Sequence, residues 1–127
     1  MVKRYLSEGA KKGEKDSLPK SFNTLKKRRE FLFLRNKGKS FKGKCFIINF
    51  LKSENSEIRV GLTVSKKIGN SVTRNYVKRL IRSIIRNNLD VIPSDLNLEI
   101  IPKKKIENKK FLELEHDFLM FIKNLEI

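Results

Sequence analysis

A polar segment from Ser65 to Arg82, SKKIGNSVTRNYVKRLIR, carries the residue types and spacing that indicate a chemical function. Between Glu57 and Asp90 there is no acidic residue, although Lys and Arg recur throughout the interval. A solvated helix face normally mixes both signs of charge, because opposite charges three or four positions apart stabilise each other. The lack of acids therefore favours binding to a polyanion over an ordinary solvated surface.

The cations of this segment are expected on one face of an amphipathic helix that runs from about Thr73 to Leu89. Apolar side chains recur at helical spacing and form the opposite, buried stripe: Val77, Leu80, Ile81, Ile84 and Ile85. The candidate RNA-binding residues are Lys66, Lys67, Asn70, Arg74, Asn75, Lys78, Arg79, Arg82 and Arg86. Cations in a first helical turn oppose the helix dipole, and a bound phosphate would relieve that conflict.

The loop before this helix, SKKIGNSV, places two lysines ahead of a turn. Gly69 permits a positive φ, and Asn70 tolerates one better than most residues do. Taken alone, the loop is typical of an ordinary connection between a strand and a helix. Together with the cationic helix, it is expected to bring lysines and backbone amides to a nucleic-acid backbone.

Composition restricts the partners of the chain. The 127 residues fit one domain, and 30 Lys and Arg against 14 Asp and Glu give a net charge of +16, which favours nucleic acid or an anionic membrane surface. No apolar run has the length of a membrane span, and no secretory signal begins the chain, so we expect no membrane partner. A single cysteine, Cys45, excludes an internal disulfide and is typical of a cytoplasmic protein.

The pattern predicts a basic, disordered tail over residues 1–22 and a single domain over residues 23–127. A first helix is expected from Asn23, with Ser21 or Asn23 as its cap and Gly38 as its stop. Two strands, in CFIINFL and IRVGLTV, are expected to form a hairpin through the polar SENSE segment, and a further short strand near Phe41 is possible.

The remaining elements are a strand in LNLEII and a final amphipathic helix, with the basic helix ended by Pro93. The side chains expected to face inward from that final helix are Phe111, Leu114, Phe118, Leu119 and Ile122. Strands mixed with helices in this order predict an α+β fold, an α-β sandwich with helices packed on one sheet.

The segment RVGLTVSKKIGNSVTRNYVKRLIR resembles the signature of the protein subunit of bacterial ribonuclease P. The family's helix motif, Arg-Asn-x-x-Lys-Arg-x-x-Arg, is matched by Arg74, Asn75, Lys78, Arg79 and Arg82, and the preceding family motif is matched from Val64 to Asn70. The upstream segments LKKRREF and KGKSFKGKCF also resemble the family's first helix and first strand, so the resemblance spans roughly residues 25–125.

This resemblance implies a fold and a function. The fold would be an α-β sandwich of about four strands and three helices with a left-handed βαβ crossover, a hand that is rare. The function would be that of the protein component of ribonuclease P, which binds a catalytic RNA and the 5′ leader of precursor tRNA while the leader is removed. The RNA would carry the catalysis with Mg²⁺, and no catalytic residue or metal site is expected on the protein.

The resemblance also implies a leader-binding cleft between the first helix and the sheet, at Phe31, Arg35, Ile47 and Asn49. Phe31 matches the first aromatic of the family's cleft, whereas the other two family aromatics fall on Arg35 and Asn49. Phe31 as an ordinary core residue is an open alternative, and Phe33 is another candidate platform. With fewer aromatics, we expect stacking to contribute less to leader binding and charge to contribute more.

The residues themselves give no catalytic set. His116 stands between Glu115 and Asp117 with no evident nucleophile, and its expected place is the surface. A non-catalytic RNA-binding structural protein, such as a ribosomal protein, is therefore the alternative hypothesis. DNA is disfavoured as a partner, because no helix-turn-helix pair flanks the basic helix.

Overall fold

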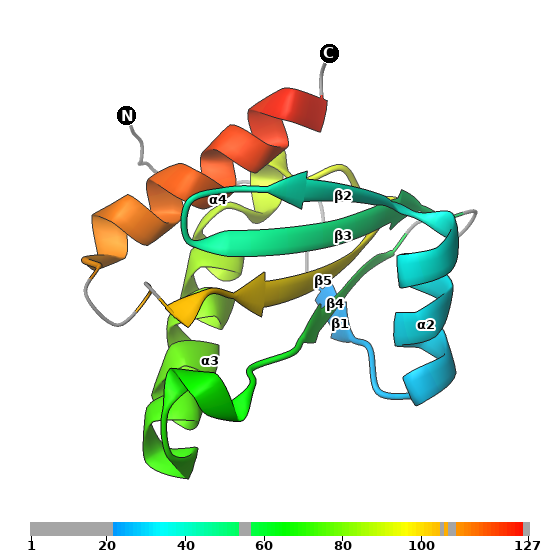
Figure 1. Ribbon diagram of the computed structural model, residues 1–127. Helices are drawn as coiled ribbons and strands as arrows, with labels where there is room; N and C mark the ends of the chain where they lie inside the picture. The colour runs from blue at the N-terminus through cyan, green and yellow to red at the C-terminus, as the bar shows by residue number, and fades with distance from the viewer. Residues whose placement is uncertain (1–21, 54–56, 105, 107–108, 126–127) are drawn as a thin grey trace.

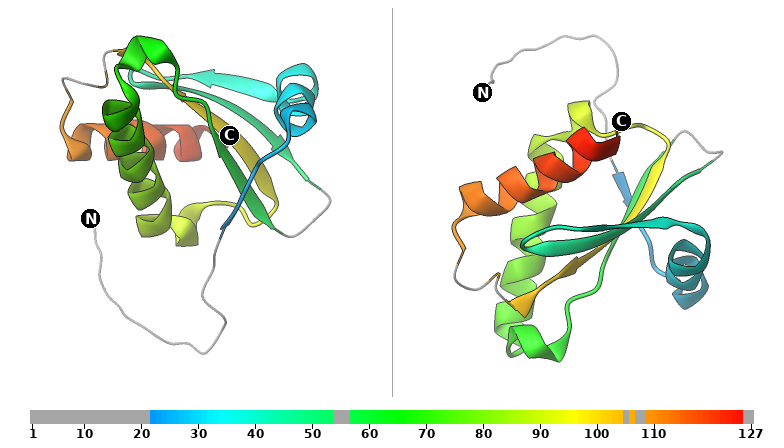
Figure 2. Two further views of the ribbon diagram at one scale, coloured as in Figure 1. Left: turned by 90° about the horizontal axis from the view of Figure 1, so that it is seen from below. Right: turned by 45° about the horizontal axis from the view of Figure 1, so that its top comes forward.

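In this computed structural model, one five-stranded sheet lies between helices on its two faces (Figures 1 and 2). The structure describes residues 22–53, 57–104, 106 and 109–125. The strands are β1 (Phe22–Thr24), β2 (Lys39–Lys42), β3 (Phe46–Lys52), β4 (Ile58–Leu62) and β5 (Leu96–Pro102). The helices are α2 (Arg28–Lys37), α3 (Ser71–Asn87) and α4 (Phe111–Leu125), with short 3₁₀ turns η3 (Lys66–Ile68) and η4 (Leu89–Val91).

The strand order is β1-β4-β5-β3-β2, so β5 lies between β3 and β4. β3 pairs with β5 in antiparallel and β4 pairs with β5 in parallel register. The predicted hairpin through SENSE is therefore wrong. The hairpin is instead formed by β2 and β3, which confirms the strand near Phe41. Closeness in sequence predicts a hairpin, but it carries no information about a strand that comes later in the chain and inserts between the two others, as β5 does here.

β4 leads through α3 to its parallel neighbour β5, and this crossover is left-handed, as the passage of α3 behind the sheet in Figure 1 shows. The resemblance implied this hand, which β-strand twist normally disfavours. The expected α+β architecture is thus confirmed, with five strands in place of about four.

The additional strand is β1, which changes the expected start of the domain. Phe22, Asn23 and Thr24 pair in parallel with β4, and the Leu25 N–H continues this pairing to the Val60 carbonyl at 3.0 Å. Asn23 therefore does not cap a helix. The first helix begins at Arg28, and the predicted tail lies outside the described residues except for Phe22, which belongs to the sheet.

The core lies between the sheet and the pair α3 and α4, which cover one face, while α2 lies on the other (Figure 2). From α3 the buried residues are Val77, Ile81, Ile84 and Ile85, as the apolar stripe predicts, with Leu80 partly buried. Two details of α4 were wrong: Leu119 is exposed, and Phe121 is fully buried against Phe41 and Phe50.

Candidate nucleic-acid interface

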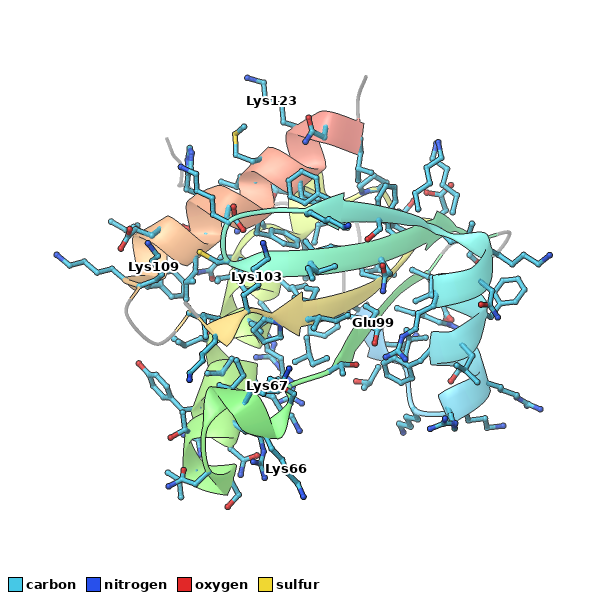
Figure 3. The ribbon with its side chains drawn as sticks, in the orientation of Figure 1. Lys66, Lys67, Glu99, Lys103, Lys109 and Lys123 are labelled. Carbon is cyan, nitrogen blue, oxygen red and sulfur yellow. The ribbon has the colours of Figure 1, made fainter. Side chains whose placement is uncertain are left out.

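The start of α3 is built by the SKKIGNSV loop much as its sequence indicates. Gly69 has a φ of 152°, and a side chain there would also crowd Thr73. Asn70 has a φ of −72° and caps the helix instead, because its side-chain oxygen accepts the Thr73 N–H at 2.9 Å. Asn70 is therefore engaged with the backbone, while Lys66 and Lys67 on η3 are exposed (Figure 3).

The polar face of α3 carries cations that form no ion pair with an acidic side chain among the described residues. Asn75, Arg79 and Arg86 are exposed, whereas Arg74, Lys78 and Arg82 are half-buried. Within the described part of the chain, the ion pairs involve Arg35, Arg59 and Lys109, and none involves a cation of η3 or α3. We call this set the cationic face: Lys66, Lys67, Arg74, Lys78, Arg79, Arg82 and Arg86.

Two members of the cationic face also have structural contacts. Arg74 donates to the Gly69 carbonyl at 2.7 Å, so it ties the loop to the helix. The Arg86 guanidinium carbon lies 5.7 Å from the centre of the Phe22 ring, within the range of a cation–π contact. These two residues therefore hold local structure in addition to presenting charge.

A shallow groove continues the cationic face toward the edge of the sheet. Lys78 and Arg82 line it from α3, and Phe22, Thr24 and Leu62 line it from β1 and β4. Phe22 and Thr24 lie beside this face, although residue 22 belongs to the predicted tail. A groove with lysine and arginine on one wall and an aromatic ring on the other fits a single-stranded nucleic acid.

On the opposite face of the sheet, Phe31 lies against a glycine of the neighbouring strand. A methyl group at Gly61 would lie 2.6 Å from Phe31 Cζ, so the absent side chain makes room for the ring. Phe31 is half-buried, while Phe33 is more than half exposed and lies off this cleft. Phe31 and Arg35, one helical turn apart, line the same shallow pocket together with Thr63.

The floor of this cleft holds a carboxylate that is absent from the predicted site residues. Glu99 on β5 has a fully buried side chain, and Figure 3 shows it between the sheet and α2. Its Oε1 accepts from Arg35 Nε at 3.0 Å and from Asn49 Nδ2 at 3.1 Å. Its Oε2 accepts from Arg35 Nη2 at 2.6 Å and from Thr63 Oγ1 at 2.6 Å. We call these four residues the Glu99 cluster.

Hydrogen bonding decides the charge state of the cluster. Burial raises the pKa of Glu99, but hydrogen bonds from Arg35, Thr63 and Asn49 outweigh it and lower the pKa below its usual value. The bond to Glu99 in turn raises the pKa of Arg35. Arg35 is therefore not a free cation, and the expectation that charge contributes more to leader binding did not include this partner.

The other predicted cleft residues have distinct places. Asn49 lies opposite Glu99 in the β3–β5 register, and Ile47 lies opposite Ile101 on the same face, half-buried. Cys45 is buried just ahead of β3, and its N–H donates to the buried Asp117 carboxylate. Burial raises the pKa of the Cys45 thiol.

The described residues do not bring together a metal-binding group. His116 is exposed on α4, as expected. Among the residues with defined positions, no three His, Cys, Asp or Glu side chains lie where they could share a metal ion. No helix in the described part of the chain is both long and apolar enough to cross a membrane. The arrangement suits binding: a cationic face on one side of the sheet and a polar cleft on the other.

Comparison with known proteins agrees with this arrangement. The sequence profile of the family Ribonuclease P matches residues 19–126. The ribonuclease P protein component of Streptococcus pneumoniae is 36% identical over 99 residues, which cover 78% of this chain and 80% of that relative. The structure is similar to the RNase P protein of Thermotoga maritima, with a TM-score of 0.74 and 32% identity over 80% of this chain and 96% of that one. It is also similar to the Staphylococcus aureus RNase P protein, with a TM-score of 0.75 and 25% identity over 84% and 98% of the two chains.

Proposed function

This chain belongs to the ribonuclease P protein family, and we propose that it binds the catalytic RNA of that enzyme through its cationic face. The observation that carries the proposal is the unbalanced charge of α3 and η3 within the described residues. A phosphate backbone supplies the missing anions, and release of its counterions drives association. The helix N-terminus behind Asn70 adds backbone N–H groups that favour phosphate.

The second part of the proposal concerns the substrate. The cleft beside α2, which contains Phe31 and the Glu99 cluster, would hold the 5′ leader of precursor tRNA. Its position supports this, because it lies on the face of the sheet opposite α3, so one molecule can contact both RNAs. A half-buried aromatic ring and a guanidinium plane are the groups on which unpaired bases stack.

In the holoenzyme, endonucleolytic removal of the leader is expected to depend on the RNA component. Mg²⁺ is the expected metal of that RNA. RNA phosphates supply the hard oxygen ligands that Mg²⁺ prefers, so we assign its binding to the RNA. The role of the protein is to position the leader and to neutralise phosphate charge near it.

Reconstitution tests this proposal. Purified protein freed of RNA is mixed with precursor tRNA in Mg²⁺ buffer, with and without a transcript of the ribonuclease P RNA from the same organism. We expect site-specific 5′ cleavage only when the transcript is present, and faster cleavage with protein than without it at low Mg²⁺. Site-specific cleavage by protein alone, or no effect of the protein on the RNA reaction, would overturn the proposal.

A further inference from the structure

The pairing of Arg35 with Glu99 leaves one edge of the guanidinium group available. The carboxylate accepts from Nε and Nη2, which lie on the same side of the planar group. Nη1 makes no hydrogen bond to any described residue, and the Arg35 side chain is 44% exposed. The edge formed by Nη1 and the second N–H of Nη2 therefore points away from the carboxylate with two parallel donors.

The cluster also fixes the direction of this edge. Glu99 is held in turn by Asn49 and Thr63, so its carboxylate cannot rotate without breaking two further hydrogen bonds. A long arginine side chain normally loses considerable conformational entropy when it binds a ligand. Here that loss occurs on folding, so the two free donors are already oriented when a ligand enters the cleft.

Two parallel N–H donors match two kinds of acceptor in RNA: the O6 and N7 atoms of guanine and two oxygens of a phosphate. The buried charge of Glu99 favours the guanine base over the phosphate. It compensates the charge of Arg35, which weakens attraction to an anionic phosphate, but it leaves the donor geometry needed by a neutral base edge unchanged. Phe31, one turn earlier on α2 and in the same pocket, offers a stacking surface for an adjacent base.

We propose that Arg35, held by Glu99, recognises a guanine base in the 5′ leader through its free Nη1–Nη2 edge. This inference rests on the proposed function, because it requires the leader to enter this cleft. In this proposal the Glu99 cluster determines specificity. Arg35 contacts the base, while Glu99, Asn49 and Thr63 position the Arg35 side chain.

The test measures holoenzyme affinity for a series of precursor tRNAs that differ at a single leader nucleotide, scanned position by position with all four bases. A bidentate arginine contact discriminates between bases by about 5- to 150-fold. We expect guanine to be preferred within that range at one leader position. We also expect 7-deazaguanine at that position to lose most of the preference, since it lacks the N7 acceptor.

Two variants assign the preference to the cluster. Arg35→Lys keeps a positive charge but removes the fork, so it should abolish the guanine preference. Glu99→Gln keeps the shape but releases the charge of Arg35, so it should weaken the preference and make leader binding more sensitive to salt. Lys123→Ala, an exposed cation on α4 remote from the cleft (Figure 3), is the matched control and should retain the preference. Circular dichroism of each variant confirms that the fold is intact.

The outcomes separate the inference from the proposed function. If the leader increases affinity but all four bases bind alike at every position, or if Arg35→Lys keeps the guanine preference, the inference is wrong. A loss of affinity in Arg35→Lys that is equal for all bases would identify a phosphate contact instead. If no leader increases affinity over mature tRNA, the leader part of the proposed function is itself overturned.

Discussion

Arg35 and Glu99 are 64 positions apart in the chain, and yet Nη2 of one lies 2.6 Å from Oε2 of the other. The two side chains differ sharply in environment, because Arg35 is 44% exposed while Glu99 is fully buried. An exposed guanidinium that loses its partner is rehydrated. A buried carboxylate that loses its partner is not rehydrated in the same way. Removing Arg35 and removing Glu99 should therefore change the free energy of unfolding by different amounts.

The first prediction concerns this asymmetry. Arg35→Ala should lower the free energy of unfolding by about 3 kcal/mol, near the lower end for a broken buried pair, because Asn49 and Thr63 still donate to Glu99. Glu99→Gln should cost less, on the order of 1–2 kcal/mol, since the amide oxygen still accepts hydrogen bonds although the amide NH2 then faces one N–H of Arg35. Urea denaturation at pH 7 measures both. A larger loss in Glu99→Gln than in Arg35→Ala would contradict this account of the pair.

The second prediction is a dependence of stability on pH. The pKa of Glu99 is lowered in the folded protein, so its ionised form stabilises the fold fully above the ordinary glutamate pKa of about 4.3. That stabilisation is lost as the pH falls below this value and passes through the lowered pKa. The difference in unfolding free energy between wild type and Glu99→Gln should thus be constant from pH 7 to about 5 and shrink at lower pH. A difference that does not change between pH 7 and 3 would exclude a lowered pKa.

The third prediction separates two arginines of the cationic face. Arg79 is exposed, so Arg79→Ala should change stability by less than about 0.5 kcal/mol. Arg74 donates to the Gly69 carbonyl, so Arg74→Ala should lower the free energy of unfolding by about 1 kcal/mol through the loss of this hydrogen bond. For each variant, losing one phosphate contact should reduce the slope of log affinity against log salt by about 0.7 to 0.9.

Binding of both variants to the ribonuclease P RNA is measured across a salt series, with Lys123→Ala as the control. The control removes one charge from α4, far from Lys66 and Lys67 in Figure 3, and should leave the slope unchanged. If the control and Arg79→Ala reduce the slope equally, net charge and not this face governs binding.

Local periodicity made α3 predictable, whereas long-range pairing hid β1 and the Glu99 cluster. Val77, Ile81 and Ile84 repeat within one helix, so their burial follows from spacing alone. Phe22–Thr24 has only three residues and is a strand because β4 pairs with it, a contact without a local signal. Glu99 stands in an apolar run, and its burial depends on donors from three other segments.

The fourth prediction tests a buried carboxylate that supports the β2–β3 hairpin. Asp117 on α4 accepts the N–H groups of Lys44 and Cys45, both at 3.0 Å. Asp117→Ala should leave both donors without a partner and lower the unfolding free energy by about 2 kcal/mol or more. Asp117→Asn retains one acceptor oxygen and should lose less. The reactivity of the Cys45 thiol in the native state should rise in Asp117→Ala. If the reactivity does not rise, the hairpin does not need the support of Asp117.

The last prediction tests whether Phe31 belongs to the cleft or only to the packing of α2. A methyl group at Gly61 would collide with the Phe31 ring, so Gly61→Ala should displace the ring without removing it. If the ring stacks on a leader base, Phe31→Ala should reduce the affinity gained from the leader by about 1–3 kcal/mol, and Gly61→Ala should reduce it as well. Since both changes act through the same ring, the double variant should lose little more than Phe31→Ala alone. Holoenzyme affinities for precursor and mature tRNA measure the leader's increment in all four proteins, and urea denaturation reports their stability. Losses that add in full would show that Gly61 acts independently of Phe31, and an unchanged increment in Phe31→Ala would make the ring a packing residue of α2.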